Sequence, residues 1–355
     1  MTSMFDPITL GAIRLPNRIV MAPLTRNRAT MPGRVPNALM RDYYVQRASA
    51  GLILTEASSV DPQGVGYPST PGCWSDEQTQ GWKQIVDGVH AAGGRIMMQL
   101  WHVGRISDPV YHDGQPTVAP SAIAPEGHVS LLRPKRLHSV PRALETEEVP
   151  GVVAAFRRGA ENAKKAGFDG VEIHGANGYL IDQFLQDGSN KRTDRYGGPI
   201  ENRARLMLEI ADACIDVWGA SRVGMHLAPR CDAHTMGDSD PAKTFGYVAS
   251  ELGRRRIAFI FARESLKEPR LGPQLRKIFG GAWIANEGLT GETAAQVLAD
   301  NEADAVSFGK DFIANPDLVE RLKQNAPLNP WVMQTFYSEG PGGYTDYPTL
   351  EAVPA

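Results

Sequence analysis

Residues 171–184 read VEIHGANGYLIDQF, and this stretch joins a buried strand to the polar groups that follow it. The apolar residues at its start, together with Gly170 before them, predict a short strand. The polar residues His174 and Asn177 come where this strand ends. Tyr179 follows where a helix is expected to begin. Two hydrogen-bond donors and a phenol after a strand are suited to hold a carbonyl oxygen and to deliver a proton beside it.

Seven other short apolar runs have the same form and end in polar residues or glycine. They are Arg18–Leu24, Leu52–Ala57, Arg95–Leu100, Val223–Ala228, Ile257–Ala262, Trp283–Asn286 and Ala305–Gly309. Runs without polar alternation are typical of strands buried on both faces of a parallel sheet. Helical periodicity appears between them, in Asp76–Ala92, Val149–Ala166, Glu201–Trp218, Pro241–Arg255 and Glu292–Asp300. This eightfold alternation predicts a closed α/β (β/α)₈ TIM barrel.

Composition narrows the class of protein. A length of 355 residues allows a large core, and a net charge of −3 gives no reason to expect nucleic acid or a membrane as partner. Cys73, Cys214 and Cys231 are far apart and odd in number, and no CxxC pair is present, so neither a disulfide framework nor a metal site is expected. We found no leader sequence and no run of about 18 apolar residues, so a cytoplasmic location is expected. Without a linker or repeat, residues 1–355 are expected to form a single domain.

Two segments depart from a minimal barrel. The N-terminal stretch ITLGAIRLP, residues 8–16, places a glycine between short apolar pieces and predicts a β-hairpin that caps the bottom of the barrel. The stretch from His102 to Pro150 is long and rich in proline, glycine and histidine. Because it follows the third strand, we expect this loop to lie over the carboxyl ends of the strands as a lid.

Polar residues at the strand ends should converge at that face of the barrel. They include Thr25, Gln99, Trp101, His174, Asn177, His226, Asn286, Gly309 and Lys310. The loops after strands seven and eight offer free backbone amides and the charge of Lys310, which favours a ligand that carries a phosphate. No glycine-rich dinucleotide motif follows the first strand, which argues against a doubly wound fold.

Six motifs carry a resemblance to a known family. They are NRIVMAPLTR (17–26), GYPSTPGCWSDEQ (66–78), MMQLWHVGR (97–105), GFDGVEIHGANGYLIDQFLQDGSNKRTDRYGG (167–198), SFGKDFIANPDL (307–318) and FYSEGPGGYTDYP (336–348). Through them nearly the whole chain resembles the Old Yellow Enzyme family of ene-reductases, of the N-ethylmaleimide reductase or xenobiotic reductase type. The resemblance implies a (β/α)₈ barrel, non-covalently bound FMN, and NADPH or NADH as hydride donor.

The resemblance also implies roles for individual residues. The flavin would be contacted by Pro23, Leu24, Thr25, Ala57, Gln99 and His226, and its phosphate held by Asn286, the Glu287 backbone, Gly309 and Lys310. The substrate pocket would be shaped by Tyr67, Trp101 and Tyr337. His174 and Asn177 would donate to the carbonyl oxygen of an activated alkene, and Tyr179 would protonate the carbon beside it. The implied substrates are small enones, enals, maleimides and nitroalkenes, and the chain would be a monomer or a homodimer.

Three positions depart from the family pattern. His226 stands where the family commonly has arginine, so we expect it to contact the flavin and to stabilise the reduced, anionic ring less than arginine would. Arg230 lies four residues later, roughly 13 Å away along an extended chain, which is far for it to replace that charge. Lys310 stands in the expected phosphate site where the family usually has arginine, so the positive charge is kept but the two parallel hydrogen bonds of a guanidinium are lost. Arg263, after the sixth strand, is expected to alter the substrate mouth or the grip on a nicotinamide phosphate.

Two other functional classes are considered for a protein with this barrel. A relative of dienoyl-CoA reductase or trimethylamine dehydrogenase would be longer and would carry a cysteine cluster, which this sequence lacks. A flavin-free hydrolase or a protein that binds a phosphate ligand would need a metal or a carboxylate pair at the strand ends. The strand ends here carry histidine, asparagine, glutamine and threonine instead.

Overall fold

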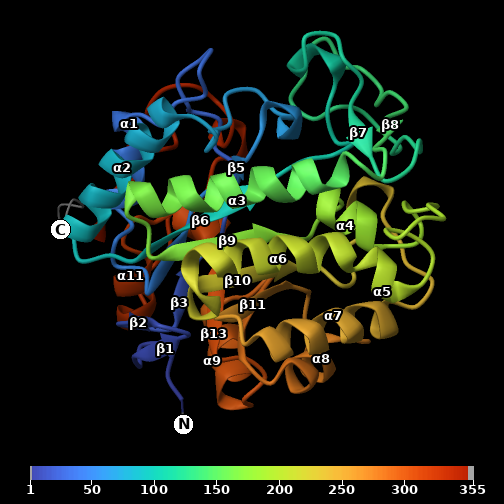
Figure 1. The fold of residues 1–355 in the computed structure, drawn as a ribbon. Helices are drawn as coiled ribbons and strands as arrows, with labels where there is room; N and C mark the ends of the chain where they lie inside the picture. The colour runs from blue at the N-terminus through green and yellow to red at the C-terminus, as the bar shows by residue number, and fades with distance from the viewer. Residues whose placement is uncertain (1, 351–355) are drawn as a thin grey trace.

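Eight parallel strands close into a barrel in the computed structural model, which describes residues 2–350 (Figure 1). The strands are β3 (Ile19–Met21), β4 (Leu52–Leu54), β6 (Ile96–Trp101), β9 (Gly170–His174), β10 (Val223–Leu227), β11 (Phe259–Arg263), β12 (Ala282–Asn286) and β13 (Ala305–Phe308). Closure comes from the pairing of β13 with β3, in the register Val306↔Ile19. The predicted barrel is confirmed. The expected single domain 1–355 includes six terminal residues, 1 and 351–355, that lie outside the described part.

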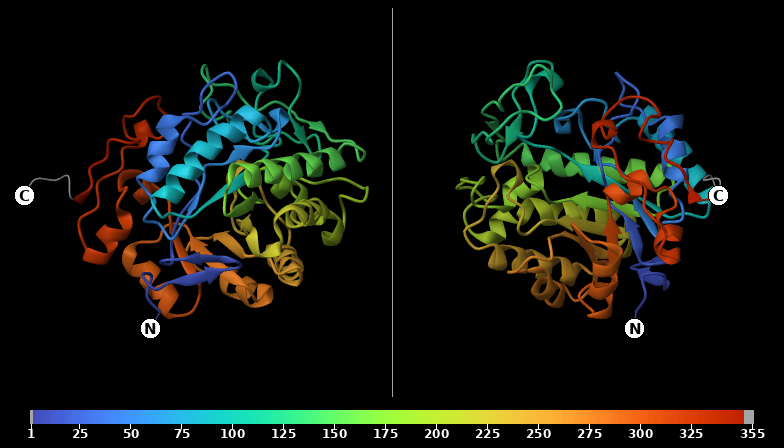
Figure 2. Two further views of the ribbon diagram at one scale, coloured as in Figure 1. Left: turned by 60° about the vertical axis from the view of Figure 1, so that its left-hand side comes forward. Right: turned by 180° about the vertical axis from the view of Figure 1, so that it is seen from behind.

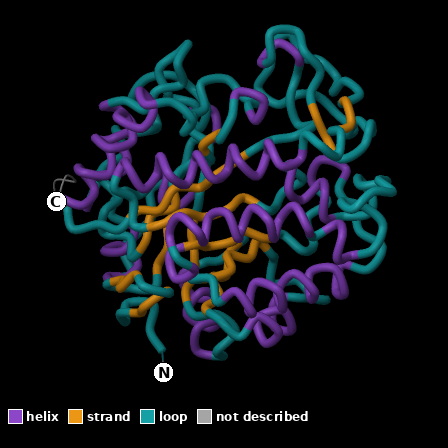
Figure 3. The backbone as a smooth tube through the Cα atoms, in the orientation of Figure 1, coloured by secondary structure: helices purple, strands orange, loops and turns teal. Residues whose placement is uncertain are grey.

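Helices surround the strands (Figures 1 and 3). The longer ones are α1 (Ala38–Val45), α2 (Asp76–Ala91), α3 (Val149–Ala166), α6 (Arg205–Trp218), α7 (Pro241–Arg255), α8 (Gly272–Phe279), α9 (Gly291–Ala299) and α11 (Leu318–Gln324). Three shorter ones follow strand ends or loops: α4 (Leu180–Leu185), α5 (Ile200–Arg203) and α10 (Lys310–Ala314). The helix predicted over 201–218 is in fact two helices, α5 and α6, which meet at Ala204. Within residues 2–350, no helix combines the length and apolarity needed to cross a membrane.

A hairpin closes the amino-terminal end of the barrel, as predicted. Strands β1 (Ile8–Leu10) and β2 (Ile13–Leu15) pair antiparallel, and their leucines and Ile13 pack against the barrel interior. The turn contains Gly11 at φ +56°, where an added Cβ would lie 2.1 Å from the Ser221 carbonyl oxygen. Only glycine fits there, because any side chain would collide with backbone at the foot of β10.

The segment between β6 and α3 stands over the opposite end of the barrel (Figures 1 and 2). It contains the 3-10 helix η2 (Pro109–Tyr111), strands β7 (Val118–Ala119) and β8 (Arg142–Ala143), and the bridge His128↔Leu137. We call residues 102–148 the lid segment. Its position at the carboxyl ends of the strands agrees with the expected lid.

Buried arginines fasten the C-terminal segment to this same end. The guanidinium of Arg26 donates to the carbonyl oxygens of Phe336 (3.1 Å) and Gly343 (2.8 Å). The rings of Tyr43 and Tyr344 stack with centroids 4.1 Å apart. The red segment therefore runs beside the blue α1 in Figure 2, and this path carries Tyr337 to the barrel mouth.

Candidate active site

Two hollows lie at the carboxyl ends of the strands. The first, which we call the barrel-end cavity, has a volume of about 740 Å³ and is lined from β3, β10, β11, β12 and β13. The second, the lid cavity, has a volume of about 450 Å³ and lies between the barrel and the lid segment. Residues close in sequence line different cavities: Leu24 and Asn177 line the barrel-end cavity, whereas Thr25 and Tyr179 line the lid cavity.

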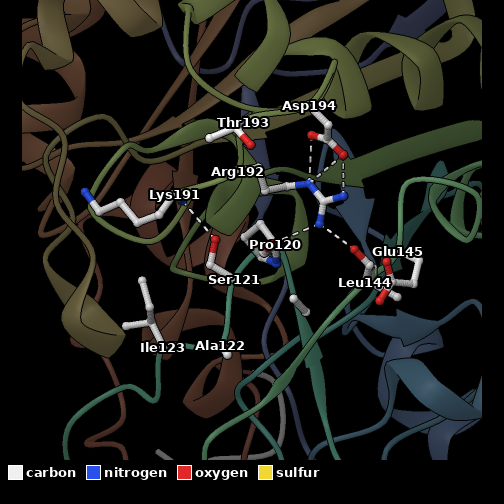
Figure 4. A pocket seen from close by; sticks show the side chains of 11 residues that line it. Pro120, Ser121, Ala122, Ile123, Leu144, Glu145, Lys191, Arg192, Thr193 and Asp194 are labelled. Carbon is white, nitrogen blue, oxygen red and sulfur yellow. Dashed lines mark hydrogen bonds and ion pairs between the residues drawn. The ribbon is translucent and has the colours of Figure 1, made fainter.

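A third hollow, of about 520 Å³, lies apart from the strand ends and holds none of the predicted site residues (Figure 4). Arg192 lines it and pairs with Asp194, and this hydrogen-bonded pair lowers the pKa of the Asp194 carboxyl. The same guanidinium donates to the carbonyl oxygens of Pro120 (3.0 Å) and Leu144. Arg192 thus has its hydrogen-bonding capacity filled, and it ties the loop after α4 to the lid segment.

Four polar side chains meet inside the barrel just below the barrel-end cavity. Strand register places Gln99 opposite Glu172, and His174 opposite His226. The Gln99 Nε2 donates to Glu172 Oε2 at 2.7 Å and lies 3.2 Å from His226 Nδ1. The rings of His174 and His226 stack with centroids 4.9 Å apart. Three adjacent strands therefore build one buried network.

This network sets the proton position on His226. An amide nitrogen only donates, so His226 Nδ1 accepts from Gln99 and the ring proton sits on Nε2. Burial, together with the neighbouring His174 ring and the Arg263 guanidinium, lowers the pKa of His226 well below its usual value. His226 Nε2 has no partner within residues 2–350. His226 is therefore a neutral ring with a buried Nε2–H, and the residue lines the barrel-end cavity. The sequence predicted a flavin contact for it.

Glu172 is a member of this network that the sequence analysis missed. Its carboxyl is fully buried, and burial raises its pKa to about 8 despite the hydrogen bond from Gln99. A signal was present, because an acidic residue in the middle of an apolar strand is unusual. Side chains two apart on a strand share a face, so Glu172 had to point inward with His174.

Tyr179 lines the lid cavity within a cluster of aromatic rings. Its Oη lies 2.9 Å from the Oη of Tyr67, and its ring centroid is 5.0 Å from that of His174. Burial raises the pKa of Tyr179 well above 10 and that of Tyr67 to about 12. Trp101 packs against both phenols but is buried behind them and lines neither cavity. Both phenols therefore keep their protons at neutral pH.

Asn177 enters the barrel-end cavity from the loop after β9. Its backbone has φ +59°, a left-handed conformation that asparagine tolerates better than most residues. The Asn177 carbonyl oxygen is 2.7 Å from His234 Nδ1, which holds the loop in place. The side-chain Oδ1 accepts a hydrogen bond from Arg263 Nη1 at 2.9 Å. The amide Nδ2 of Asn177 therefore remains as the donor of this side chain.

Most of the residues expected to contact a flavin line the barrel-end cavity. They are Pro23, Leu24, His226, Asn286, Glu287, Gly309 and Lys310. Thr25 lines the lid cavity with Tyr67 and Tyr337, whereas Ala57 and Gln99 are buried beside the two cavities. Arg230 does not join them, because its guanidinium donates to the Lys267 carbonyl oxygen at 2.7 Å.

The barrel-end cavity suits a flavin nucleotide. Its volume is within the range of about 300–1,000 Å³ that small-molecule sites occupy. One end carries the loop at Gly288 and the start of α10 at Gly309, with the ammonium of Lys310, as an anion requires. Gly309 packs closely at this end, because an added Cβ would lie 3.1 Å from the side chain of Leu24. His226, whose buried Nε2 has no partner within residues 2–350, lines the same cavity.

Comparison with known proteins agrees with this geometry. The chain matches the NADH:flavin oxidoreductase / NADH oxidase family over residues 3–329. It is 43% identical to putative 12-oxophytodienoate reductase 4 of Oryza sativa subsp. japonica, covering 98% of this chain and 93% of that protein. The structure of morphinone reductase in complex with tetrahydroNAD superposes with a TM-score of 0.95 at 47% identity, covering 99% and 98% of the two chains.

A second solved structure gives the same result. The old yellow enzyme homologue from Zymomonas mobilis superposes with a TM-score of 0.96 at 44% identity, covering 98% of this chain and all of that one. Similarity of this extent in both sequence and fold establishes the family. The chain belongs to the Old Yellow Enzyme family of flavin- and nicotinamide-dependent oxidoreductases.

Proposed function

We propose that the protein is an FMN-dependent, NAD(P)H-driven ene-reductase that saturates the C=C bond of α,β-unsaturated carbonyls and other activated alkenes. The observation that carries the proposal is the packing of Tyr179 against His174, with ring centroids 5.0 Å apart, while Tyr179 lines the lid cavity and Asn177 lines the neighbouring barrel-end cavity. Relatives whose names include 12-oxophytodienoate reductase and morphinone reductase support a carbonyl-activated alkene as substrate class. A flavin-free hydrolase is not compatible with membership of this family.

The barrel-end cavity would hold FMN. The phosphate would lie at Asn286, the Glu287 backbone, Gly309 and Lys310, and the ring would extend toward His226. The Lys310 ammonium would contribute a single positive charge to the phosphate, without the two parallel hydrogen bonds that an arginine could form. FMN bound there would supply a hydride for the β-carbon of the alkene. NADPH or NADH would renew that hydride, and the tetrahydroNAD bound to morphinone reductase supports a nicotinamide site at this mouth.

His174 and Asn177 would bind the carbonyl oxygen on which negative charge develops. Asn177 presents its Nδ2, because its Oδ1 is already bonded to Arg263. Burial lowers the pKa of His174 to about 3, so the ring is neutral and offers an N–H rather than a cation. Loss of one such donor costs about 3 kcal/mol of barrier in comparable oxyanion sites.

Tyr179 would deliver the proton to the carbon beside the carbonyl. A phenol with a raised pKa holds its proton until a strongly basic carbon is presented to it. The hydrogen bond between the Tyr179 and Tyr67 hydroxyls gives the spent phenol a neighbour that can return a proton. Tyr67 faces the lid cavity, through which solvent reaches the pair.

An anaerobic titration tests the proposed function. The purified protein should be yellow, its visible absorbance should bleach on addition of NADPH or NADH, and an enone, a maleimide or a nitroalkene should restore it. The saturated product should form in proportion to the nicotinamide consumed. A colourless protein that binds no added FMN, or a reduced protein that no activated alkene re-oxidises, would contradict the proposal.

A further inference from the structure

His226 leaves β10 without a permanent charge, and the neighbouring strand supplies one. We propose that Arg263, at the end of β11, is a positioning residue that orients Asn177 and carries the permanent positive charge beside the flavin ring. This inference rests on the proposed function.

Strand register places Arg263 on the wall of the barrel-end cavity. His226 of β10 is paired with Phe261 of β11, and the two rings are in contact with centroids 4.7 Å apart. Arg263 lies two residues after Phe261, so it projects from the same face of the strand. All three side chains line the barrel-end cavity. Among the described residues that line this cavity, Arg263 is the only arginine. Lys310 follows β13, two strands along the barrel from β11, and its ammonium lies 4.8 Å from the centroid of the Trp331 ring.

Arg263 decides which atom of Asn177 faces the substrate. A guanidinium has only donors, so the hydrogen bond of 2.9 Å from Nη1 must be accepted by Asn177 Oδ1. The terminal torsion of asparagine is broad and roughly two-fold, and without this bond the amide could present either end. The guanidinium therefore keeps Nδ2 directed away from itself and available to a carbonyl oxygen.

Glu287 holds the other edge of the same guanidinium. Its Oε1 accepts from Arg263 Nη2 at 3.1 Å. Glu287 has φ +99°, a backbone conformation that is unfavourable for a residue other than glycine and that proteins retain where the surroundings compensate. Arg263 is thus fixed between Asn177 and Glu287, and the carboxylate offsets part of its charge.

This arrangement predicts redox shifts of opposite sign. Arg263→Met removes a cation and should lower the midpoint potential of the bound flavin, whereas Glu287→Gln removes an anion and should raise it. We expect roughly a tenfold change in the two-electron equilibrium in each case, about 30 mV. Arg230→Met is the matched control and should leave the potential unchanged, because Arg230 is bonded to the Lys267 carbonyl outside the cavity. Shifts of the same sign, or no shift in Arg263→Met, would overturn the assignment of charge.

A binding measurement tests the positioning role separately. TetrahydroNAD serves as probe, because its nicotinamide ring is already hydrogenated and gives up no hydride. Arg263→Met should weaken its binding roughly tenfold, and Asn177→Ala should add little when combined with Arg263→Met, because the two residues act as one unit. Arg263→Lys should restore the potential but not the affinity, since lysine keeps the charge and loses the fork.

The outcomes separate this inference from the proposed function. Additive effects of Arg263→Met and Asn177→Ala would reject the positioning role. Wild-type protein that binds no flavin would reject the proposed function itself. Wild-type protein that binds flavin and reduces alkenes, with an unchanged potential and unchanged tetrahydroNAD affinity in Arg263→Met, would reject the inference alone.

Discussion

Replacement of Tyr179 with phenylalanine isolates the proton-transfer step. The variant removes one oxygen and leaves the ring that packs against Trp101 and His174. General acid catalysis contributes about 10²–10⁴-fold, so alkene reduction should fall by at least about a hundredfold. Reduction of the flavin by NADPH requires no proton at carbon, and its rate should stay within about twofold of wild type.

The structural cost of this substitution is small by comparison. The Tyr67 hydroxyl loses its partner at 2.9 Å, which costs about 1 kcal/mol of folding free energy. Tyr67→Phe breaks the same hydrogen bond but keeps the acid, so it is the matched control and should slow alkene reduction only several-fold. Stopped-flow measurement of both half-reactions separates the two variants. Equal losses in the two variants, or a wild-type alkene rate in Tyr179→Phe, would refute the assignment of Tyr179 as the acid.

Three further predictions concern the buried network and the oxygen clamp. His226→Arg should raise the flavin midpoint potential, because it adds a permanent cation, and spectroelectrochemical titration that shows no upward shift would contradict this. His174→Ala or Asn177→Ala should each lower the alkene-reduction rate roughly a hundredfold, the equivalent of about 3 kcal/mol, and rates near wild type would exclude a role as oxyanion donors. Glu172 has a folded pKa raised from 4.5 to about 8, so the unfolded chain loses this proton first and stability should fall as pH rises between those values. Glu172→Gln keeps the acceptor for Gln99 and should reduce this fall in thermal unfolding; an unchanged pH dependence of Tm would show that Glu172 does not titrate in this way.

The barrel could be predicted because each of its strands and turns has a signal within its own short stretch of sequence. Each strand is an unbroken apolar run that ends in polar residues, and the hairpin turn has a glycine where no side chain fits. Helices α1 and α8 were missed because they are short, and α8 begins with a glycine and a proline. The helix break at Ala204 likewise has no local signal.

The parts of the site that escaped prediction depend on alignment between strands. The placement of Gln99 between Glu172 and His226 follows from the register of β6, β9 and β10. The contact of Arg263 with Asn177 joins residues 86 positions apart. Their spacing in sequence carries no sign of either contact, whereas strand-end residues could be grouped because all parallel strands finish at one face.

The position of an isotope label tests the central claim most directly. Reduction of an enone with unlabelled NADPH in deuterated buffer should give a ketone with deuterium at the α-carbon, because the Tyr179 proton exchanges with solvent. Tyr179→Phe should lose most of the product. An α-carbon without deuterium in the wild-type product would contradict a solvent-exchangeable acid at Tyr179.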